Sequence, residues 1–242
     1  MSTADTADPA DPAHAGVLRI VAPRQGTTRV VLIRHGEAEC NLNRVVGGVK
    51  GCTGLTDLGR RQVAALADRL YESGELRDAT TLYSSVLLRA VETAERLRAV
   101  VGPGPSALGP VVQRCDLCEL HPGQSDGMSW DEVVEAFGVP DWDRDPGAPL
   151  APGGESWSGF IVRAADAVRD VAGRHPGELV VAAVHAGLIE ACLISFLRVP
   201  PEVYRRGWVH IVHASMTEFA WVPDEDRWVL MRFNDACGIP SR

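Results

Sequence analysis

The chain has 242 residues, 45% of them hydrophobic, which argues for one or two globular domains. Its formal net charge is -8 and its basic residues are spread along the sequence, which argues against a nucleic-acid binder. No run of about 18 apolar residues occurs, and residues 1–16 contain no apolar segment, so we expect no membrane span, no secretory signal and a cytoplasmic location. Six cysteines scattered through a chain of this size predict free thiols rather than a disulfide framework.

The N-terminal part divides into a polar tail and the start of a sheet. Residues 1–16 are rich in Ala, Asp and Pro without periodicity, which predicts a disordered tail before a single domain at 17–242. Residues 29–34 form a short apolar, β-branched run, typical of a buried strand, and this run ends directly before His35. Residues 57–71 carry apolar side chains at helical spacing.

The middle of the chain alternates between strand and helix patterns and then breaks the alternation. Strand patterns at residues 80–83 and 111–114 flank a helical pattern at 87–101, which indicates βαβ units and a sheet with helices on its faces. Residues 119–154 are rich in Pro, Gly, Asp and Trp, with one helical pattern near 129–137, and are predicted to form an inserted cap.

The C-terminal part returns to the alternation. A helix is expected at about residues 155–173, followed by the most apolar strand of the sequence, 179–184, which ends before His185. Runs at 215–222 and 228–233, separated by a polar turn, predict a hairpin. The predicted fold class is α/β: a three-layer α/β/α sandwich with a mostly parallel central sheet and an inserted cap.

Two histidines follow two of the predicted core strands. Ligands of open α/β sheets bind beyond the carboxyl ends of the strands, so His35 and His185 are expected to face one crevice. Arg34 precedes the first histidine, and Arg89 lies near the start of a helix, where backbone amides also favour an anion. Paired donors of this kind suit a phosphomonoester dianion, although Arg89 considered alone is equally well explained as a solvated helix residue.

These residues belong to an ordered set of motifs. The set comprises Arg34-His35-Gly36-Glu37 with Asn41, Leu55-Thr56-Asp57, Ser84-Ser85 with Arg89, Glu119 with Gly123, Gly153-Gly154-Glu155-Ser156 with Arg163, His185-Ala186-Gly187, and Asn234-Asp235. In this order, from about residue 28 to 236, the motifs resemble those of the histidine phosphatase superfamily, also called phosphoglycerate-mutase-like. No single motif is specific, but the ordered set covers nearly all of the predicted domain.

The resemblance implies a metal-independent phosphatase that hydrolyses a small phosphomonoester through a phosphohistidine at His35, without a cofactor. It implies that Glu119 protonates the leaving alkoxide and then deprotonates the attacking water, a role worth ~10²- to 10⁴-fold in rate. Arginines and the second histidine would hold the phosphoryl oxygens, and Asn41 would add a further phosphate contact. The predicted catalytic residues are His35, Glu119, Arg34, Arg89 and His185, and the predicted substrate-binding residues are Asn41, Lys50 and Ala186.

The loop at residues 44–54 departs from the pattern of the family and contains Lys50, the only lysine of the chain. Lys50 is predicted to reach a second anionic group of the substrate, with a solvated surface lysine as the competing and more common interpretation. Trp130, Trp142 and Trp157 could stack on a ring-bearing substrate, although large aromatic side chains more often pack in a core.

Cys115 and Cys118 form a Cys-x-x-Cys pair with His121 three residues later. A single pair without a second one at ligand spacing is weak evidence for zinc. From the sequence we therefore predict two ordinary, semi-buried thiols and no metal site.

Two other functions compete with the phosphatase. A phosphoglycerate-type phosphomutase would use the same catalytic residues, but the sequence Leu-His-Pro-Gly at 120–123 and the short cap favour hydrolysis. A non-catalytic module that binds a phospho-ligand would be expected to lack the nucleophile or the acid, whereas His35 and Glu119 are both present. The expected partner is a small phosphomonoester, the oligomeric state is open between a monomer and a homodimer, and the substrate itself is left open because the cap and loop decide it.

Overall fold

The computed structural model describes residues 26–103, 108–200, 207 and 209–241, so the predicted tail at 1–16 lies outside the described residues. The described part is built on one six-stranded sheet with the order β3-β2-β4-β1-β5-β6. Its strands are β1 (Thr28–Arg34), β2 (Ala79–Ser84), β3 (Val112–Gln113), β4 (Leu179–Val184), β5 (Met216–Val222) and β6 (Arg227–Asp235). The first four strands in this order pair in parallel, and β5 and β6 add antiparallel pairs, so the prediction of a mostly parallel sheet is confirmed.

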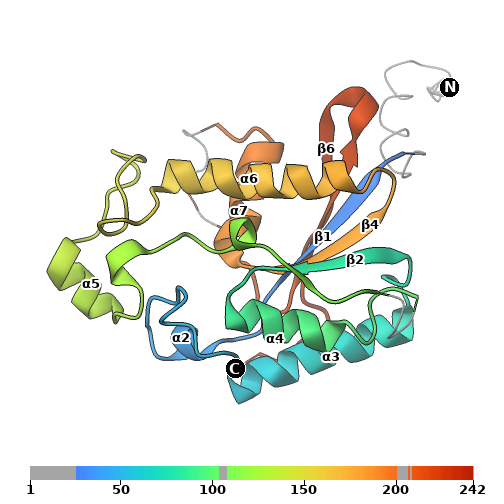
Figure 1. The fold of residues 1–242 in the computed structure, drawn as a ribbon, viewed down its shortest axis with the longest axis horizontal. Coiled ribbons are helices and arrows are strands. Elements are labelled where there is room, and N and C mark those ends of the chain that lie inside the picture. Colours follow the sequence, from blue (N-terminus) through green and yellow to red (C-terminus); the bar gives the residue numbers. More distant parts are fainter. Residues whose placement is uncertain (1–25, 104–107, 201–206, 208, 242) are drawn as a thin grey trace, which may run out of the picture.

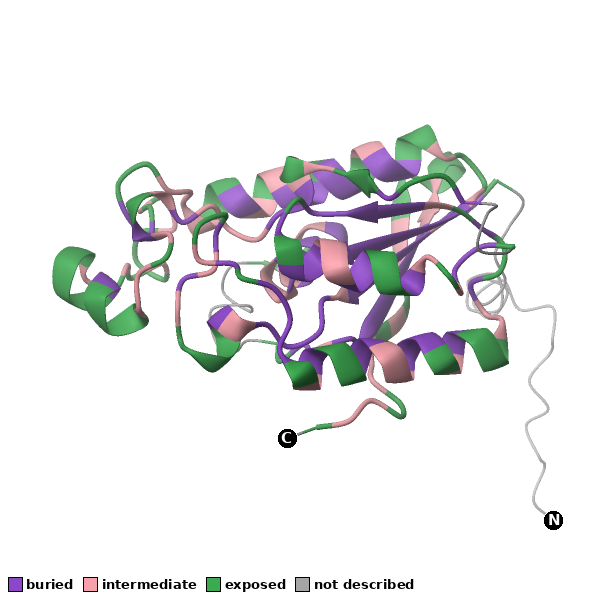
Figure 2. Cartoon of the chain, turned by 60° about the horizontal axis from the view of Figure 1, so that its bottom comes forward, coloured by how far each residue is buried: buried purple, intermediate pink, exposed green. Residues whose placement is uncertain are grey.

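Helices cover both faces of the sheet and produce the predicted three layers (Figure 1). The helices are α2 (Glu39–Leu42), α3 (Asp57–Ser73), α4 (Leu88–Leu97), α5 (Trp130–Phe137), α6 (Trp157–Arg174) and α7 (Ala186–Phe196). Alternate residues of β1 enter different cores: Val30 and Leu32 pack with α6 and α7, while Val31 and Ile33 pack with α3 and α4. The strands between the helix layers are therefore buried almost throughout (Figure 2).

The predicted elements differ from the observed ones mainly at their ends. The helix predicted at 57–71 runs to Ser73 and ends at Gly74, which adopts the left-handed conformation with φ 65° that glycine accommodates readily. The helix predicted at 87–101 is shorter, because α4 ends at Leu97 and a turn continues to residue 101. Ser156 caps α6 by accepting a hydrogen bond from the Gly159 amide.

Two helices were not predicted from the sequence. Helix α2 is a single turn, too short to show a periodicity. Helix α7 is apolar on nearly all sides, because it packs against both α6 and the sheet, so its sequence lacks the polar face that indicates an amphipathic helix. The segment that follows His185 is thus a helix, and His185 is its N-cap residue.

The predicted cap region forms its own small apolar cluster. Val133 on α5 packs with Val46 and Leu150, and Met128 and Trp142 lie against them. This cluster lies apart from the two cores of the sheet, and α5 projects from the body of the molecule in Figure 1. The boundaries at 119–154 stay a prediction.

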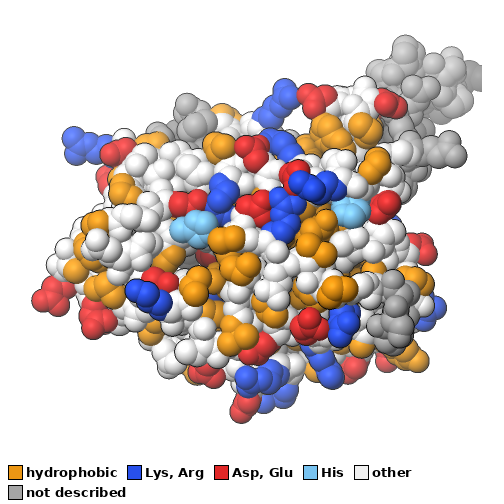
Figure 3. Space-filling model, viewed as in Figure 1, with side chains coloured by type: hydrophobic (Ala, Val, Ile, Leu, Met, Phe, Trp, Pro, Cys, Tyr) orange, Lys and Arg blue, Asp and Glu red, His pale blue; other side chains and the backbone are white. Residues whose placement is uncertain are grey.

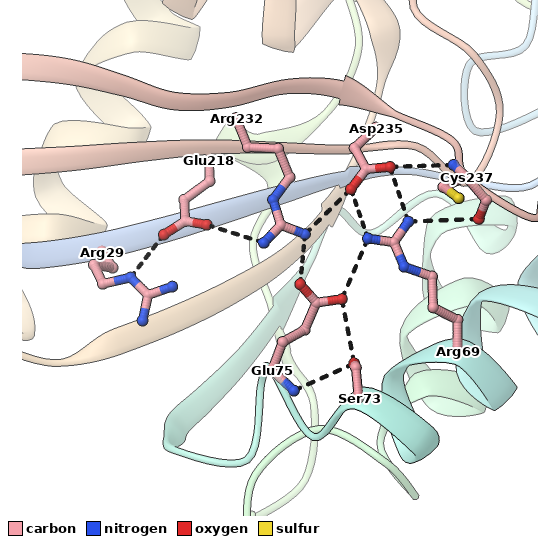
Figure 4. A network of polar contacts seen from close by, with 8 residues as sticks. All are labelled: Arg29, Arg69, Ser73, Glu75, Glu218, Arg232, Asp235 and Cys237. Carbon is pink, nitrogen blue, oxygen red and sulfur yellow. Dashed lines mark hydrogen bonds and ion pairs between the residues drawn. The ribbon is translucent and has the colours of Figure 1, made fainter. Parts of the chain in front are cut away.

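A network of ion pairs attaches the C-terminal hairpin to the rest of the fold (Figure 4). Arg69 on α3 binds Asp235 at 2.6 Å, and Arg232 on β6 binds Glu75 at 2.6 Å. Hydrogen bonds from Arg69 lower the pKa of Asp235 to about 2. Asp235, part of the last sequence motif, therefore serves to hold the hairpin against α3.

Charged side chains of both signs are interspersed on the face seen in Figure 3, without one continuous basic surface. Among the residues that the structure describes, no helix combines the length and the apolar character that crossing a bilayer would require.

Candidate active site

Three neighbouring parallel strands end at the same edge of the sheet and bring polar side chains together. Arg34 pairs with Val184 in the register of β1 and β4, so His35 and His185 follow the two strands side by side. Their ring centroids are 5.2 Å apart. Ser85 follows β2 at the same edge, where its amide donates to the carbonyl of Ala183.

A pocket of about 490 Å³ opens beside these strand ends. This volume is suitable for a small ligand. The predicted site residues that line it are Arg34, His35, Asn41, Arg89, Glu119 and Ala186. His185 lies directly behind His35 and is completely buried.

Hydrogen bonds determine which nitrogen of His35 faces a ligand. Nδ1 lies 2.6 Å from the Gly36 carbonyl, which can only accept, so the proton is on Nδ1. Nε2 accepts a hydrogen bond from Nε of Arg89 at 3.1 Å. The unprotonated nitrogen of His35 therefore points toward a guanidinium at the pocket, in the tautomer that a nucleophile requires.

The same surroundings keep His35 uncharged. Burial lowers the pKa of His35 well below its ordinary value of 6.5, and the positive charges of Arg89 and Arg34 act in the same direction. The side chain is only 3% exposed. His35 is thus neutral at physiological pH.

Arg34 and Arg89 both bring positive charge close to His35. Arg89 is 4% exposed and donates from Nη1 to the Gly47 carbonyl at 2.7 Å. Arg34 donates from Nη1 to the Ile211 carbonyl, while its buried Nε has no hydrogen-bond partner in the described structure. Burial lowers the pKa of Arg34 to about 10, which leaves the guanidinium charged at neutral pH. Among the described residues neither arginine forms an ion pair, so an anion would complete the site.

His185 also has a buried ring nitrogen without a partner. Ser85 Oγ accepts from the Leu87 amide at 3.2 Å and lies 2.7 Å from His185 Nε2, so the hydroxyl can donate its proton to that nitrogen. In that tautomer the ring proton is on Nδ1, which is buried and has no partner within the described part of the chain. Burial also lowers the pKa of His185 well below 6.5.

The loop that holds Arg34 is itself held by Asn234. The Asn234 amide group donates to the His210 carbonyl and accepts from the Val212 amide, both at 2.8 Å. Ile211, whose carbonyl binds Arg34, lies between these two residues. The Asn234-Asp235 motif thus supports the site from behind rather than lining the pocket.

Glu119 lies opposite these cationic groups and is oriented from two sides. Its Oε2 accepts from the amide of Gly187, in the first turn of α7, at 2.9 Å. Arg163 on α6 donates to the Glu119 carbonyl at 3.1 Å and is paired with Glu155 at 2.6 Å. Helix α7, which the sequence did not predict, therefore presents both His185 at its N-terminus and the amide that orients the Glu119 carboxylate.

Substituting Gly187 with alanine is expected to lower kcat about 10²-fold, because a Cβ there would overlap with Oε1 of Glu119 and displace the carboxylate. The check is kcat measured beside the midpoint temperature of unfolding, which should change little. Gly173→Ala on α6 is the matched control, since no atom lies within 4 Å of its Cβ position. Equal kcat for Gly187→Ala and the unaltered protein would contradict the proposed position of Glu119.

The buried histidines also make the fold sensitive to acid. Between pH 7.5 and 5.5 the unfolded chain protonates His35 and His185, whereas the folded chain keeps both neutral because their pKa values are lowered. The free energy of unfolding should therefore fall by about 1.4 kcal/mol per histidine, about 2.7 kcal/mol together. Urea unfolding at the two pH values measures this loss. In His185→Asn the loss should be about half as large, and an unchanged pH dependence would contradict the assignment.

The chain matches the sequence profile of the Histidine phosphatase superfamily (branch 1) over residues 30–236. The chain belongs to this superfamily. It is 33% identical to the metal-independent phosphoserine phosphatase of Arabidopsis thaliana, with 88% of this chain and 84% of the relative covered. It is 30% identical to the glucosyl-3-phosphoglycerate phosphatase of Mycobacterium tuberculosis, with 88% and 97% covered. Among solved structures, YhfR of Bacillus stearothermophilus superposes with a TM-score of 0.73 at 26% identity, covering 88% of this chain and all of that one.

The membership confirms the family, fold class and enzyme class predicted from the sequence: the protein is a histidine phosphatase, a phosphoric monoester hydrolase. The individual roles predicted for the site residues stay predictions. Of the predicted substrate contacts, Asn41 and Ala186 line the pocket of this histidine phosphatase. Lys50 does not line it; the residue is exposed, and within the described residues only its backbone amide is held, by Asp126 at 2.9 Å. The geometry therefore gives the predicted role of Lys50 no support.

Several residues of the site were missed in the sequence. Glu190 on α7 lines the pocket, and burial raises its pKa above the ordinary value, with the charge of Glu119 acting the same way. His213 lies 5.8 Å from His35 between ring centroids. Ser85 Oγ lies within hydrogen-bond distance of His185 Nε2 and orients that ring. A helical spacing from Ala186 could have indicated Glu190, but the apolar character of α7 concealed the helix.

The three tryptophans considered in the sequence all line the pocket. The rings of Trp142 and Trp157 stack on each other at 5.8 Å, and the Trp142 indole donates to the Ala148 carbonyl. Trp130 is 41% exposed and lines the pocket without a ring contact to either of the other two tryptophans in the described structure. Two of the tryptophans thus pack as a wall, while the third is available to a ligand.

Proposed function

We propose that this histidine phosphatase hydrolyses a small phosphomonoester by transferring the phosphoryl group first to Nε2 of His35 and then to water. The observation that carries the proposal is the neutral, Nδ1-protonated imidazole of His35 beside two unpaired arginines. A neutral nucleophile surrounded by fixed positive charge matches the needs of phosphoryl transfer, in which negative charge spreads over three equatorial oxygens.

The phosphoryl oxygens would take the donors that lack acceptors without substrate. These are Nε of Arg34 and Nδ1 of His185, both buried. Nε of Arg89 would turn from His35 to a phosphoryl oxygen, which frees the lone pair of Nε2 for attack on phosphorus. Binding and activation of the nucleophile are then one event.

One proton is transferred in each of the two steps of the reaction. The ester P–O bond breaks as the bond from phosphorus to His35 Nε2 forms, and the leaving alkoxide takes a proton from Glu119. Glu119 then accepts a proton from the water that attacks the phosphohistidine, which releases inorganic phosphate and restores His35. Glu119 is supported in this role by its place in the pocket wall and by the Gly187 amide that orients it.

The pocket wall suggests which leaving group it accepts. Beyond the groups proposed to bind phosphate the wall is mostly apolar, with the partly exposed indole of Trp130 as a surface for apolar contact and Glu190 as an acceptor for a hydroxyl or an ammonium group. Two relatives are named as phosphatases of small organic phosphates, one of phosphoserine and the other of glucosyl-3-phosphoglycerate. We therefore infer a leaving group that combines a flat apolar face with hydrogen-bond donors.

Trapping of the intermediate tests the proposal. The protein is mixed with a panel of phosphomonoesters, quenched in base, where phosphohistidine survives, and digested for mass spectrometry of the peptide with His35. We expect a phosphohistidine at His35 and release of one inorganic phosphate per ester. Formation of a phosphate isomer without phosphate release would instead identify a phosphomutase, and absence of both across the panel would contradict catalysis.

A further inference from the structure

A short turn beside the pocket gathers three side chains that bind metals in other proteins. The 3-10 helix η1 (Cys115–Leu117) begins at Cys115, and the Cys118 amide donates to the Cys115 carbonyl at 3.0 Å. In this geometry residues three apart eclipse each other, so both thiols lie on the same side of the turn. The imidazole of His121 faces them, and one ligand atom from each of the three residues lies within 4.8 Å of the others.

We propose that Cys115, Cys118 and His121 form a binding site for a soft divalent cation of the zinc type. Sγ of Cys115 and Nε2 of His121 are 3.8 Å apart. Sulfur and nitrogen ligands on a tetrahedral zinc ion are separated by about 3.6 Å, given bonds of about 2.3 and 2.0–2.1 Å. Thiolate and imidazole ligands select zinc over magnesium or calcium, and two thiolates would neutralise the charge of the cation.

The surroundings of the imidazole match those of a metal ligand. Nδ1 of His121 lies 3.6 Å from Oε2 of Glu155, and a small turn of the ring would let the carboxylate accept the Nδ1 proton while Nε2 faces the thiols. Carboxylates behind ligating histidines fix the ring and its tautomer in this way. The sequence alone could not reveal this arrangement, because Glu155 is 34 residues away from His121 along the chain.

The backbone that bears the cysteines is held in place without a cation. Arg163 donates from Nη1 to the carbonyls of Asp116 at 2.7 Å and of Cys118 at 3.1 Å. Binding would therefore need only small side-chain movements. Cys115 is exposed and the His121 side chain is 42% exposed, which leaves a path for the cation and an open fourth position for water.

The site lies on the segment that carries Glu119 but takes no part in phosphoryl transfer. A cation there would connect the turn at Cys115 to His121 and restrain the residues between them, including Glu119. The inference does not rest on the proposed function, since metal binding is measured without any phosphate ester. If the metal site is disproved, the proposed phosphatase mechanism is unaffected, and the reverse also holds.

Titration with Co²⁺ under a non-chelating reductant tests the site. We expect one equivalent to bind with thiolate-to-cobalt charge-transfer absorption, to be displaced by Zn²⁺, and to slow amide hydrogen exchange in residues 115–121. Cys115→Ser and His121→Ala should each lower the affinity at least about tenfold. Both replaced side chains are accessible to solvent, so thermal unfolding can verify that the variants remain folded.

Cys237→Ser is the matched control, because Cys237 is likewise exposed but lies in the C-terminal segment attached to α3. Its Co²⁺ affinity should equal that of the unaltered protein. The proposal is overturned if no saturable Co²⁺ binding occurs, if Cys115→Ser binds as tightly as the unaltered protein, or if Cys237→Ser abolishes the charge-transfer band.

Discussion

His35→Ala is expected to lower kcat by at least about 10⁴-fold, because it removes the atom that we propose receives the phosphoryl group. The groups proposed to bind phosphate belong to other residues, Arg34, Arg89 and His185, so the variant should still bind inorganic phosphate. Steady-state kinetics together with calorimetric phosphate titration separate the two effects. A loss of turnover with retained phosphate binding would identify His35 as the nucleophile rather than as part of the anion site.

His213→Gln is the control for this result, because it removes another imidazole whose ring is close to that of His35. The phosphohistidine should still form in this variant. If His35→Ala kept kcat within tenfold of the unaltered protein while His213→Gln abolished turnover, the assignment of the nucleophile would be wrong.

Glu119→Gln is expected to separate substrates by their leaving groups. For alkyl phosphomonoesters kcat/KM should fall ~10²- to 10⁴-fold, because an alkoxide cannot leave without a proton. For p-nitrophenyl phosphate kcat/KM should change less than about tenfold, because nitrophenolate leaves unprotonated. Attack of water would still lack its base, so nitrophenolate should appear in a burst of one equivalent per site while phosphohistidine accumulates. Rapid-mixing absorbance measurements would resolve the burst.

Glu190→Gln is the control for this pattern, because Glu190 is the other carboxylate among the described residues that line the pocket. We expect it to change KM more than it changes the ratio of kcat/KM for alkyl phosphomonoesters to kcat/KM for p-nitrophenyl phosphate. Should Glu190→Gln give the burst and Glu119→Gln lower kcat/KM equally for both substrates, the proton donor is Glu190.

The sequence alone predicted the parts of the fold that depend on local pattern. The apolar run that ends at Arg34 and the run that ends at Val184 predicted two core strands whose histidines face one crevice, and the observed register places His35 beside His185. The helical spacing at residues 57–71 predicted α3, which extends to Ser73 and ends before Gly74. These features are local, because buried strands need continuous apolar residues and a helix end needs a residue that tolerates positive φ.

Features that depend on contacts between distant segments were missed or misread. Helix α7 was missed because burial on nearly all sides removes the amphipathic period. Lys50 was predicted to reach a second anionic group because it is the only lysine and its loop departs from the pattern of the family; it is not among the residues that line the pocket, and its role stays a prediction. Asp235 was grouped with motifs of the site, yet its partners Arg69 and Arg232 place it in an ion-pair network.

What the sequence determined, then, is which residue types stand at the ends of the core strands: a histidine preceded by an arginine, and a second histidine. Tertiary structure alone decided the chemical state of His35. Its tautomer depends on the Gly36 carbonyl and Arg89, and its lowered pKa depends on burial and on charges brought from separate elements. A pKa reports the local dielectric environment and nearby charges, neither of which is defined until the chain has folded.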